Sequence, residues 1–131
     1  MALVIDASVA VEYLLRTDLG QRVAGRIERE DLVAPELLDA EVLAIFRRAW
    51  LAKKLTPARS AAALEDLVAW KVRRVPHVAL VREAWNFRQN VSAYDALYLA
   101  TGHLFNAPVL TADGPLSRAP RTGVVVENVR A

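Results

Sequence analysis

The 131-residue sequence contains no cysteine, which excludes disulfide bonds and thiolate metal ligands. No apolar run approaches the roughly 18 residues that a membrane-spanning helix requires. The first residues lack the basic segment of a secretory signal peptide, and Asp6 and Glu12 interrupt the apolar stretch there. Internal repeats, low-complexity segments and glycine/serine linkers are also absent. We therefore expect a cytoplasmic protein that does not enter a membrane and folds as one domain over residues 1–131.

The chain also has little net charge, because its formal value of +2 is too small to indicate a partner. The distribution is more informative: residues 47–74 carry eight basic side chains against two acidic ones. The basic residues are Arg47, Arg48, Lys53, Lys54, Arg59, Lys71, Arg73 and Arg74. A local basic region is typical of nucleic-acid binding, but a solvated helical hairpin produces the same excess.

Short apolar runs that suit buried strands alternate with helical patterns along the whole chain. Strands are predicted at residues 3–5, 32–34, 72–75, 108–111 and 124–126. Helices are predicted at residues 9–16, 18–29, 36–53, 57–71, 79–90 and 93–105, with Ser8, Thr56 and Ser92 as candidate N-caps. This alternation predicts an α/β domain with a mostly parallel sheet of about five strands and helices on both faces.

Two of the predicted strands end close to a carboxylate. Asp6 follows the strand at residues 3–5 directly, and Asp113 lies two residues after Thr111, which ends the strand at residues 108–111. The carboxyl ends of parallel strands meet at one edge of a sheet, and ligands bind outside that edge. The sequence therefore predicts that Asp6 and Asp113 face the same crevice.

Two further acids belong to helices that pack on this sheet. Glu41 lies at the margin of the apolar stripe of the helix at residues 36–53, and Asp95 opens the helix at residues 93–105. Each acid also has a local explanation, namely helix capping for Asp6, an Asx turn for Asp113, a capping box for Asp95 and an ion pair with Arg48 for Glu41.

Several carboxylates in one cleft repel one another, so either some of them are protonated or a cation holds them together. An all-oxygen ligand set without cysteine selects Mg²⁺ or Mn²⁺. Such an ion activates water and neutralises charge on a phosphoryl oxygen. Together with the basic region, the acids indicate hydrolysis of a phosphodiester bond.

The chain resembles the PIN-domain ribonucleases of the VapC toxin type. The resemblance is carried by the motifs at residues 4–8 (VIDAS), 38–42 (LDAEV), 92–98 (SAYDALY) and 111–113 (TAD), in this order and spacing. It implies a three-layer sandwich with a five-stranded parallel sheet. It also implies that the chain is usually dimeric, cleaves RNA, and is inhibited by a VapB-type antitoxin that is encoded beside it.

The resemblance also implies roles for individual residues. Asp6, Glu41, Asp95 and Asp113 match the catalytic quartet that works with Mg²⁺ or Mn²⁺. Asp6, Asp95 and Asp113 are the implied metal ligands, and the hydroxyls of Ser8 and Thr111 match the polar positions behind them.

The sequence departs from the family at Gly114 and Pro115, where family members often carry a basic residue after the last acid. Glu12 lies one helical turn from Ser8, and we expect it to face solvent rather than the metal site. His77 and His103 have no role in the predicted mechanism.

Two other functions remain as alternatives. The same fold can serve as a non-catalytic module that binds RNA or a protein through the basic helices. A phosphoryl-acceptor or phosphatase domain with Asp6 as nucleophile is disfavoured, because such chemistry needs a second acid beside the nucleophile, and here Ala7 and Ser8 follow.

Overall fold

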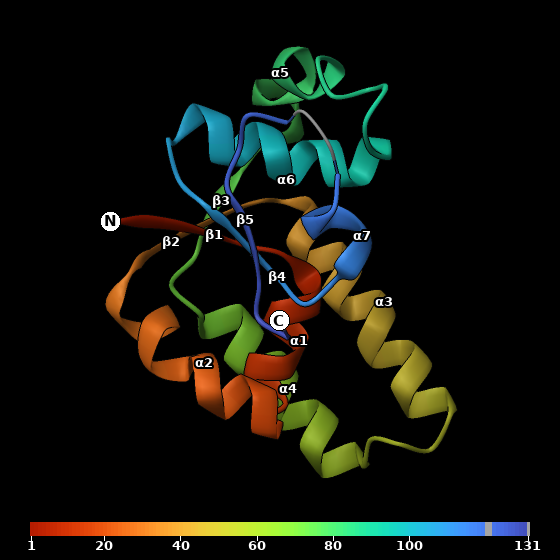
Figure 1. Cartoon of the computed structure of the whole chain (residues 1–131). Coiled ribbons are helices and arrows are strands. Elements are labelled where there is room, and N and C mark those ends of the chain that lie inside the picture. Colours follow the sequence, from red (N-terminus) through yellow and green to blue (C-terminus); the bar gives the residue numbers. More distant parts are fainter. Residues whose placement is uncertain (120–121, 131) are drawn as a thin grey trace.

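A five-stranded parallel sheet forms the centre of the computed structural model, which describes residues 1–119 and 122–130 (Figure 1). The strand order is β3-β2-β1-β4-β5, and every pair of neighbours is parallel. The strands are β1 (Ala2–Ile5), β2 (Asp31–Pro35), β3 (Arg73–Val75), β4 (Val109–Thr111) and β5 (Val126–Asn128). The predicted parallel sheet is therefore confirmed.

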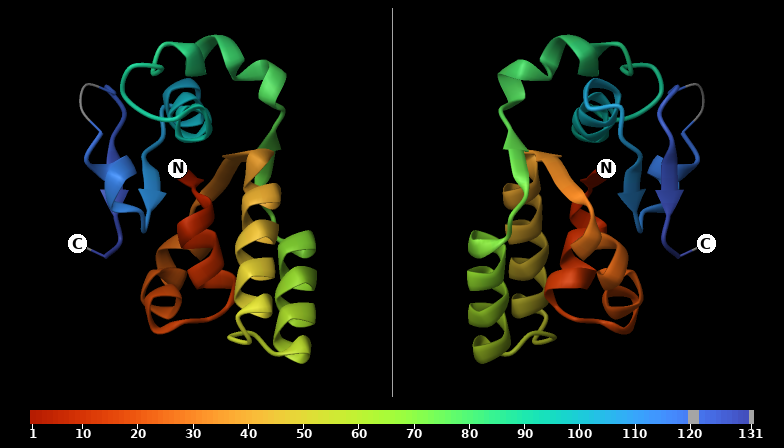
Figure 2. Two further views of the ribbon diagram at one scale, coloured as in Figure 1. Left: turned by 90° about the vertical axis from the view of Figure 1, so that its right-hand side faces the viewer. Right: turned by 90° about the vertical axis from the view of Figure 1, so that its left-hand side faces the viewer.

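Helices cover both faces of the sheet and give three layers (Figure 2). One layer holds α1 (Ala7–Leu14), α2 (Asp18–Arg29), α3 (Leu37–Leu51) and α4 (Pro57–Ala69). The other holds the 3₁₀ turn η1 (His77–Ala79), α5 (Val81–Trp85) and α6 (Ala93–Leu104). The short helix α7 (Gly114–Ser117) follows β4 at its carboxyl end.

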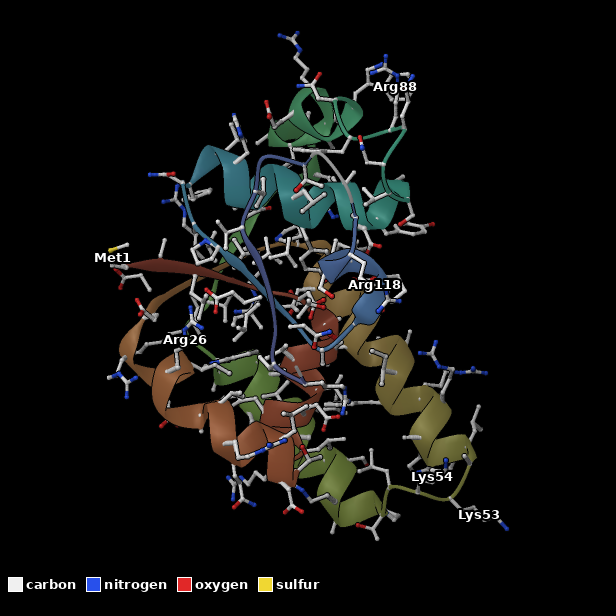
Figure 3. The ribbon with its side chains drawn as sticks, viewed as in Figure 1. Met1, Arg26, Lys53, Lys54, Arg88 and Arg118 are labelled. Atoms are coloured by element: carbon white, nitrogen blue, oxygen red, sulfur yellow. The ribbon has the colours of Figure 1, made fainter. Side chains whose placement is uncertain are left out.

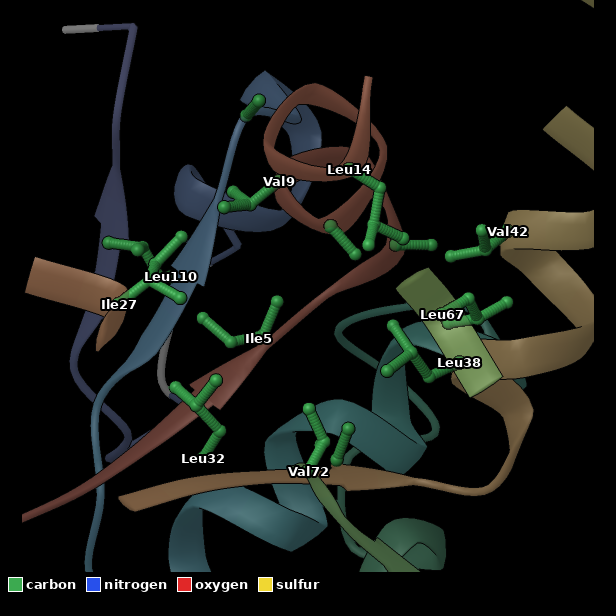
Figure 4. Packing of buried hydrophobic residues seen from close by; sticks show 14 of the residues in the cluster. Ile5, Val9, Leu14, Ile27, Leu32, Leu38, Val42, Leu67, Val72 and Leu110 are labelled. Atoms are coloured by element: carbon green, nitrogen blue, oxygen red, sulfur yellow. The ribbon is translucent and has the colours of Figure 1, made fainter. Parts of the chain in front are cut away.

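The core is divided between the two faces, because successive side chains of a strand point to opposite sides. In β1, Leu3 and Ile5 pack with the layer of α1 to α4, whereas Val4 packs with α5 and α6. Figure 4 shows Ile5 among the side chains of the first cluster, and neighbours from β2 and β4, Leu32 and Leu110, lie beside it. Since β1 is the central strand, its carboxyl end lies in the middle of the sheet edge.

Side-chain caps begin four of the helices. Asp6, Thr17, Thr56 and Ser92 each accept a hydrogen bond from a backbone N–H of the first turn, at 3.1 Å. The predicted caps Thr56 and Ser92 are confirmed. The prediction of Ser8 as a cap is wrong, because α1 begins at Ala7 and Asp6 caps it.

The predicted helix at residues 79–90 is also wrong in extent. The chain forms η1 after Pro76, then α5, and continues after Trp85 in turns closed by i→i+3 hydrogen bonds such as Phe87 N–H to Ala84 O (3.0 Å). Leu80, Ala84 and Phe87 are all buried as predicted. An apolar stripe with this spacing is satisfied by either kind of turn, so the pattern located the buried side but not the helix length.

Two corrections concern the carboxyl-terminal part. Residues 114–117 form α7, which begins with Gly114 and Pro115, where the sequence indicated only a turn. The last strand is Val126–Asn128 rather than residues 124–126, because its register is set by pairing with β4, in which Val109 lies opposite Val126.

Candidate active site

A cleft of about 410 Å³ opens at the carboxyl edge of the sheet, and Asp6, Glu41, Asp95 and Asp113 all line it. Asp6 directly follows β1, and the other acids come from α3, from the first turn of α6 and from the residue before α7. The four acids that the sequence singled out are thus brought together from four separate segments. A larger hollow of about 770 Å³ lies at the amino ends of β2 and β3, the edge at which parallel sheets do not bind ligands.

Asp6 is the most buried of these acids, with 5% of its surface exposed. Its Oδ1 accepts hydrogen bonds from Ser8 Oγ (2.6 Å) and from the backbone N–H of Val9 (3.1 Å), and its Oδ2 accepts one from Thr111 Oγ1. Burial raises the pKa of Asp6 to about 6, the charge of Asp113 adds to the rise, and the three hydrogen bonds oppose it. Asp6 therefore caps α1 and at the same time presents a desolvated carboxylate to the cleft.

Ser8 and Thr111 tie the ends of the two central strands together behind Asp6. Besides donating to Asp6, Ser8 Oγ accepts a hydrogen bond from the backbone N–H of Ala112 (2.8 Å), and Thr111 Oγ1 accepts one from that of Asp113 (2.8 Å). Both hydroxyls thus stand where the sequence expected polar supporting groups. The network orients Asp6 and fixes the backbone that carries Asp113.

The remaining acids are coupled through their charges. The pKa of the half-buried Asp95 is raised, first by burial and then by the carboxylates of Asp113 and Glu41. Since Asp113 also acts on Asp6, the four groups form one electrostatic cluster. Among the described residues, no three histidine, cysteine, aspartate or glutamate side chains converge closely enough to hold an ion as they stand.

Tyr98 is a site residue that the sequence reasoning did not single out. Its hydroxyl, on the buried side of α6, donates a hydrogen bond of 2.6 Å to Glu41 Oε1. Burial and the contact with Glu41 raise the pKa of Tyr98, so the phenol stays protonated and remains a donor. The sequence did contain a signal for it, because Tyr98 lies three residues after Asp95 and therefore on the same face of one helix. Arg48, which the sequence offered as an alternative ion-pair partner for Glu41, lines the cleft without forming an ion pair with a described residue.

Tyr98→Phe is expected to lower catalytic activity by about 10-fold to 100-fold, because it frees the Glu41 carboxylate without removing it. The cost in stability should be about 1 kcal/mol, since Glu41 is half-exposed and water replaces the lost donor. Measurements of kcat and of the melting temperature for the wild type and Tyr98→Phe check both expectations. A variant with wild-type kcat would show that the hydrogen bond has only a structural role.

The basic region between residues 47 and 74 does not form one continuous surface. Arg74 pairs with Asp39 (3.1 Å) and donates to the carbonyl oxygens that end α4, and Arg59 donates to Leu14 O (2.7 Å). These two arginines hold the fold together. Lys53 and Lys54 instead project from the far end of the α3–α4 hairpin (Figure 3).

Glu12 does not reach the cleft. Its carboxylate pairs with Arg130 (2.8 Å) and accepts a hydrogen bond from Thr17 Oγ1. Glu12 thus lies outside the lining of the cleft as expected, but it is paired and only 20% exposed instead of facing solvent freely. His77 and His103 also lie outside the cleft, next to Glu36 and Glu83 respectively.

Comparisons with known proteins agree with this geometry. The family model described as PIN domain matches residues 3–121. Ribonuclease VapC1 of Mycobacterium tuberculosis is 36% identical over 129 residues, which are 97% of each chain. Ribonuclease VapC12 of the same organism is 29% identical over 127 residues, which are 97% of this chain and 98% of that one.

A solved structure has the same fold. The crystal structure of VapBC2 from Rickettsia felis, bound to a DNA fragment from its promoter, aligns with a TM-score of 0.65 at 14% identity and covers 98% of both chains. The chain therefore belongs to the PIN domain family. Within that family its sequence stands among the VapC ribonucleases.

In the described part of the chain, no helix has the length and apolarity to cross a membrane.

Proposed function

We propose that this protein is an Mg²⁺- or Mn²⁺-dependent endoribonuclease toxin that a VapB-type antitoxin neutralises. The observation that carries the proposal is the cleft in which Asp6, Glu41, Asp95 and Asp113 meet, in a chain that is 36% identical to a VapC ribonuclease over almost its whole length. The relatives supply the reaction class, and the cleft supplies residues suited to it.

The donor set of the cleft fits a hard divalent cation. The described lining offers carboxylate and hydroxyl oxygens and contains neither cysteine nor histidine. Asp6, Asp95 and Asp113 would hold the ion, and two of them have a raised pKa that a cation would lower again. When bound, the ion would supply charge neutralisation at the scissile phosphate and a more acidic water.

The residues of the chain have separate tasks in this proposal. Ser8, Thr111 and the amino end of α1 fix the orientation of Asp6. Glu41 is held through Oε1 by Tyr98, which leaves Oε2 to accept a proton from the attacking water. Asp6 and Glu41 thus act in preset positions and lose little freedom on reaching the transition state.

The partners follow from the same family membership. VapBC2 from Rickettsia felis was crystallised bound to a DNA fragment from its promoter, and a VapB-type antitoxin is the corresponding partner for this chain. We also propose a homodimer or a toxin–antitoxin hetero-oligomer as the assembled form.

The direct test is incubation of the purified protein with total RNA and Mn²⁺, with and without EDTA. We expect cleavage only where the metal is available, and a rise in melting temperature when Mn²⁺ binds the folded state. RNA binding without cleavage and without a Mn²⁺-dependent shift would instead identify the non-catalytic module that the sequence left as an alternative.

A further inference from the structure

Two arginines near the acidic cleft have no ion-pair or hydrogen-bond partner among the residues that the structure describes. Arg48 lies on α3, two helical turns after Glu41, and lines the cleft. Arg118 follows α7, whose first residue adjoins Asp113. Both are exposed, and neither side chain forms an ion pair or hydrogen bond with a described residue, although four carboxylates lie close by.

This isolation distinguishes them from arginines that support the fold. Arg26 is paired with Glu127, Arg74 with Asp39 and Arg130 with Glu12. Within the described part of the chain, no acceptor takes the guanidinium donors of Arg48 or Arg118, which suits both groups to bind a ligand.

The place of Arg118 depends on a glycine. A Cβ atom added to Gly114 would lie 3.1 Å from Arg118 Cζ and 3.2 Å from its Nη2, closer than ordinary contacts. The guanidinium thus lies over the bare backbone of Gly114, next to Asp113. The chain lacks a basic residue directly after Asp113, and Arg118 folds back to put a cation in this region.

We propose that Arg48, in the lining of the cleft, and Arg118, directly after α7 and over Gly114, contact the phosphates of RNA bound at the acids. The proposal rests on the proposed ribonuclease function and names residues that bind its substrate. RNA is a polyanion, and four carboxylates in the cleft repel it. A bound divalent cation offsets only part of this negative charge. Planar guanidinium groups bind phosphate oxygens through two parallel hydrogen bonds, which suits them to hold the strand on either side of the acids.

Lys53 and Lys54 are too far from the four acids to hold RNA at the cleft as Arg48 and Arg118 would. They lie beyond the end of α3, roughly 18 Å along the helix from Glu41. Figure 3 shows Arg118 beside α7 and the two lysines at the distant end of the hairpin. The lysines therefore contact RNA only where it extends well past the cleft.

The test measures the salt dependence of RNA binding in EDTA, where the proposed reaction cannot proceed. Fluorescence anisotropy of a labelled single-stranded oligouridylate is followed across KCl concentrations for the wild type, Arg48→Gln and Arg118→Gln. Each variant is expected to reduce the slope of log K against log[salt] by about 0.7, the value for one lost contact with a single strand. Arg22→Gln is the matched control and should keep the wild-type slope, because Arg22 is exposed on α2, away from the cleft, and has no partner among the described residues.

A second variant tests the position of Arg118 without removing its charge. Gly114→Ala places a methyl group where the guanidinium lies and should reduce the slope as Arg118→Gln does, because the flexible side chain moves while the fold is retained. Wild-type slopes in both Arg48→Gln and Arg118→Gln would overturn the proposal, because neither arginine would then contact a phosphate of the bound RNA. A wild-type slope in Gly114→Ala alone would overturn the stated position of Arg118.

The cleavage assay separates this proposal from the proposed function. If the wild type cleaves RNA with Mn²⁺ but the variants bind with an unchanged slope, the ribonuclease stands and the phosphate contacts fail. If no RNA is cleaved but the slopes fall as expected, the contacts stand and the catalytic function fails.

Discussion

Asp6→Asn and Asp95→Asn are each expected to reduce Mn²⁺-dependent RNA cleavage by at least about 100-fold, the range found when preset charged groups are removed from a site. Both substitutions keep the size of the side chain and remove the negative charge that would hold the cation. Asp6 is the more sensitive position, because it is buried and oriented by three hydrogen bonds. Cleavage rates measured against Mn²⁺ concentration check this prediction.

The same variants should remain folded. In Asp6→Asn, the amide oxygen still accepts from Ser8 and Val9, and the amide N–H₂ donates to the hydroxyl of Thr111, which accepts as well as donates. Asp31→Asn is the matched control, because Asp31 is 94% exposed and lies at the amino end of β2. Full activity in Asp6→Asn or Asp95→Asn would remove the catalytic assignment.

The stability of the metal-free protein is expected to fall as the pH rises from about 4 to about 7. Burial raises the pKa of Asp6 from 3.8 to about 6, so the folded state binds its proton more tightly than the unfolded state does. The stabilising contribution is fully present below the unfolded pKa and is lost as the pH rises through the folded value. A shift of this size corresponds to about 3 kcal/mol of unfolding free energy, on the order of 10 °C in melting temperature.

Saturating Mg²⁺ or Mn²⁺ should remove this loss, because the cation favours the ionised carboxylates and binds only the assembled site. Melting temperature against pH is measured with and without metal for the wild type, Asp6→Asn and Asp113→Asn. The fall with pH should be much smaller in Asp6→Asn, in which only the raised pKa of Asp95 still contributes. It should be smaller in Asp113→Asn, which removes a secondary cause of the shift but leaves burial.

Parallel curves for the wild type with and without metal would contradict the prediction. They would show that the carboxylates do not share one cation, and the proposed ribonuclease would lose its physical basis. A fall of equal size in Asp6→Asn would show instead that another group is responsible.

The sequence alone determined the fold class and the origin of the acids. The strands at residues 3–5 and 109–111 are buried on both faces, as parallel strands must be, and a carboxylate follows each of them closely. The sequence also predicts which edge of the sheet holds the cleft, because the acids follow the strands and therefore lie at their carboxyl ends. Asp6 is both the cap of α1 and a cleft residue, so the capping and site explanations for it were never exclusive.

Tertiary structure decided the features that depend on which segments meet. The sequence placed Glu41 beside Arg48, which is close along the helix, but its carboxylate is held by Tyr98, fifty-seven residues away. Arg74 and Arg59 contributed to a basic region in the sequence, yet their donors are used within the fold. Whether an arginine side chain is used within the fold or left for a ligand depends on which carboxylates and carbonyl oxygens lie within its reach. That depends on packing between layers, whereas periodicity records only which side of each element is buried.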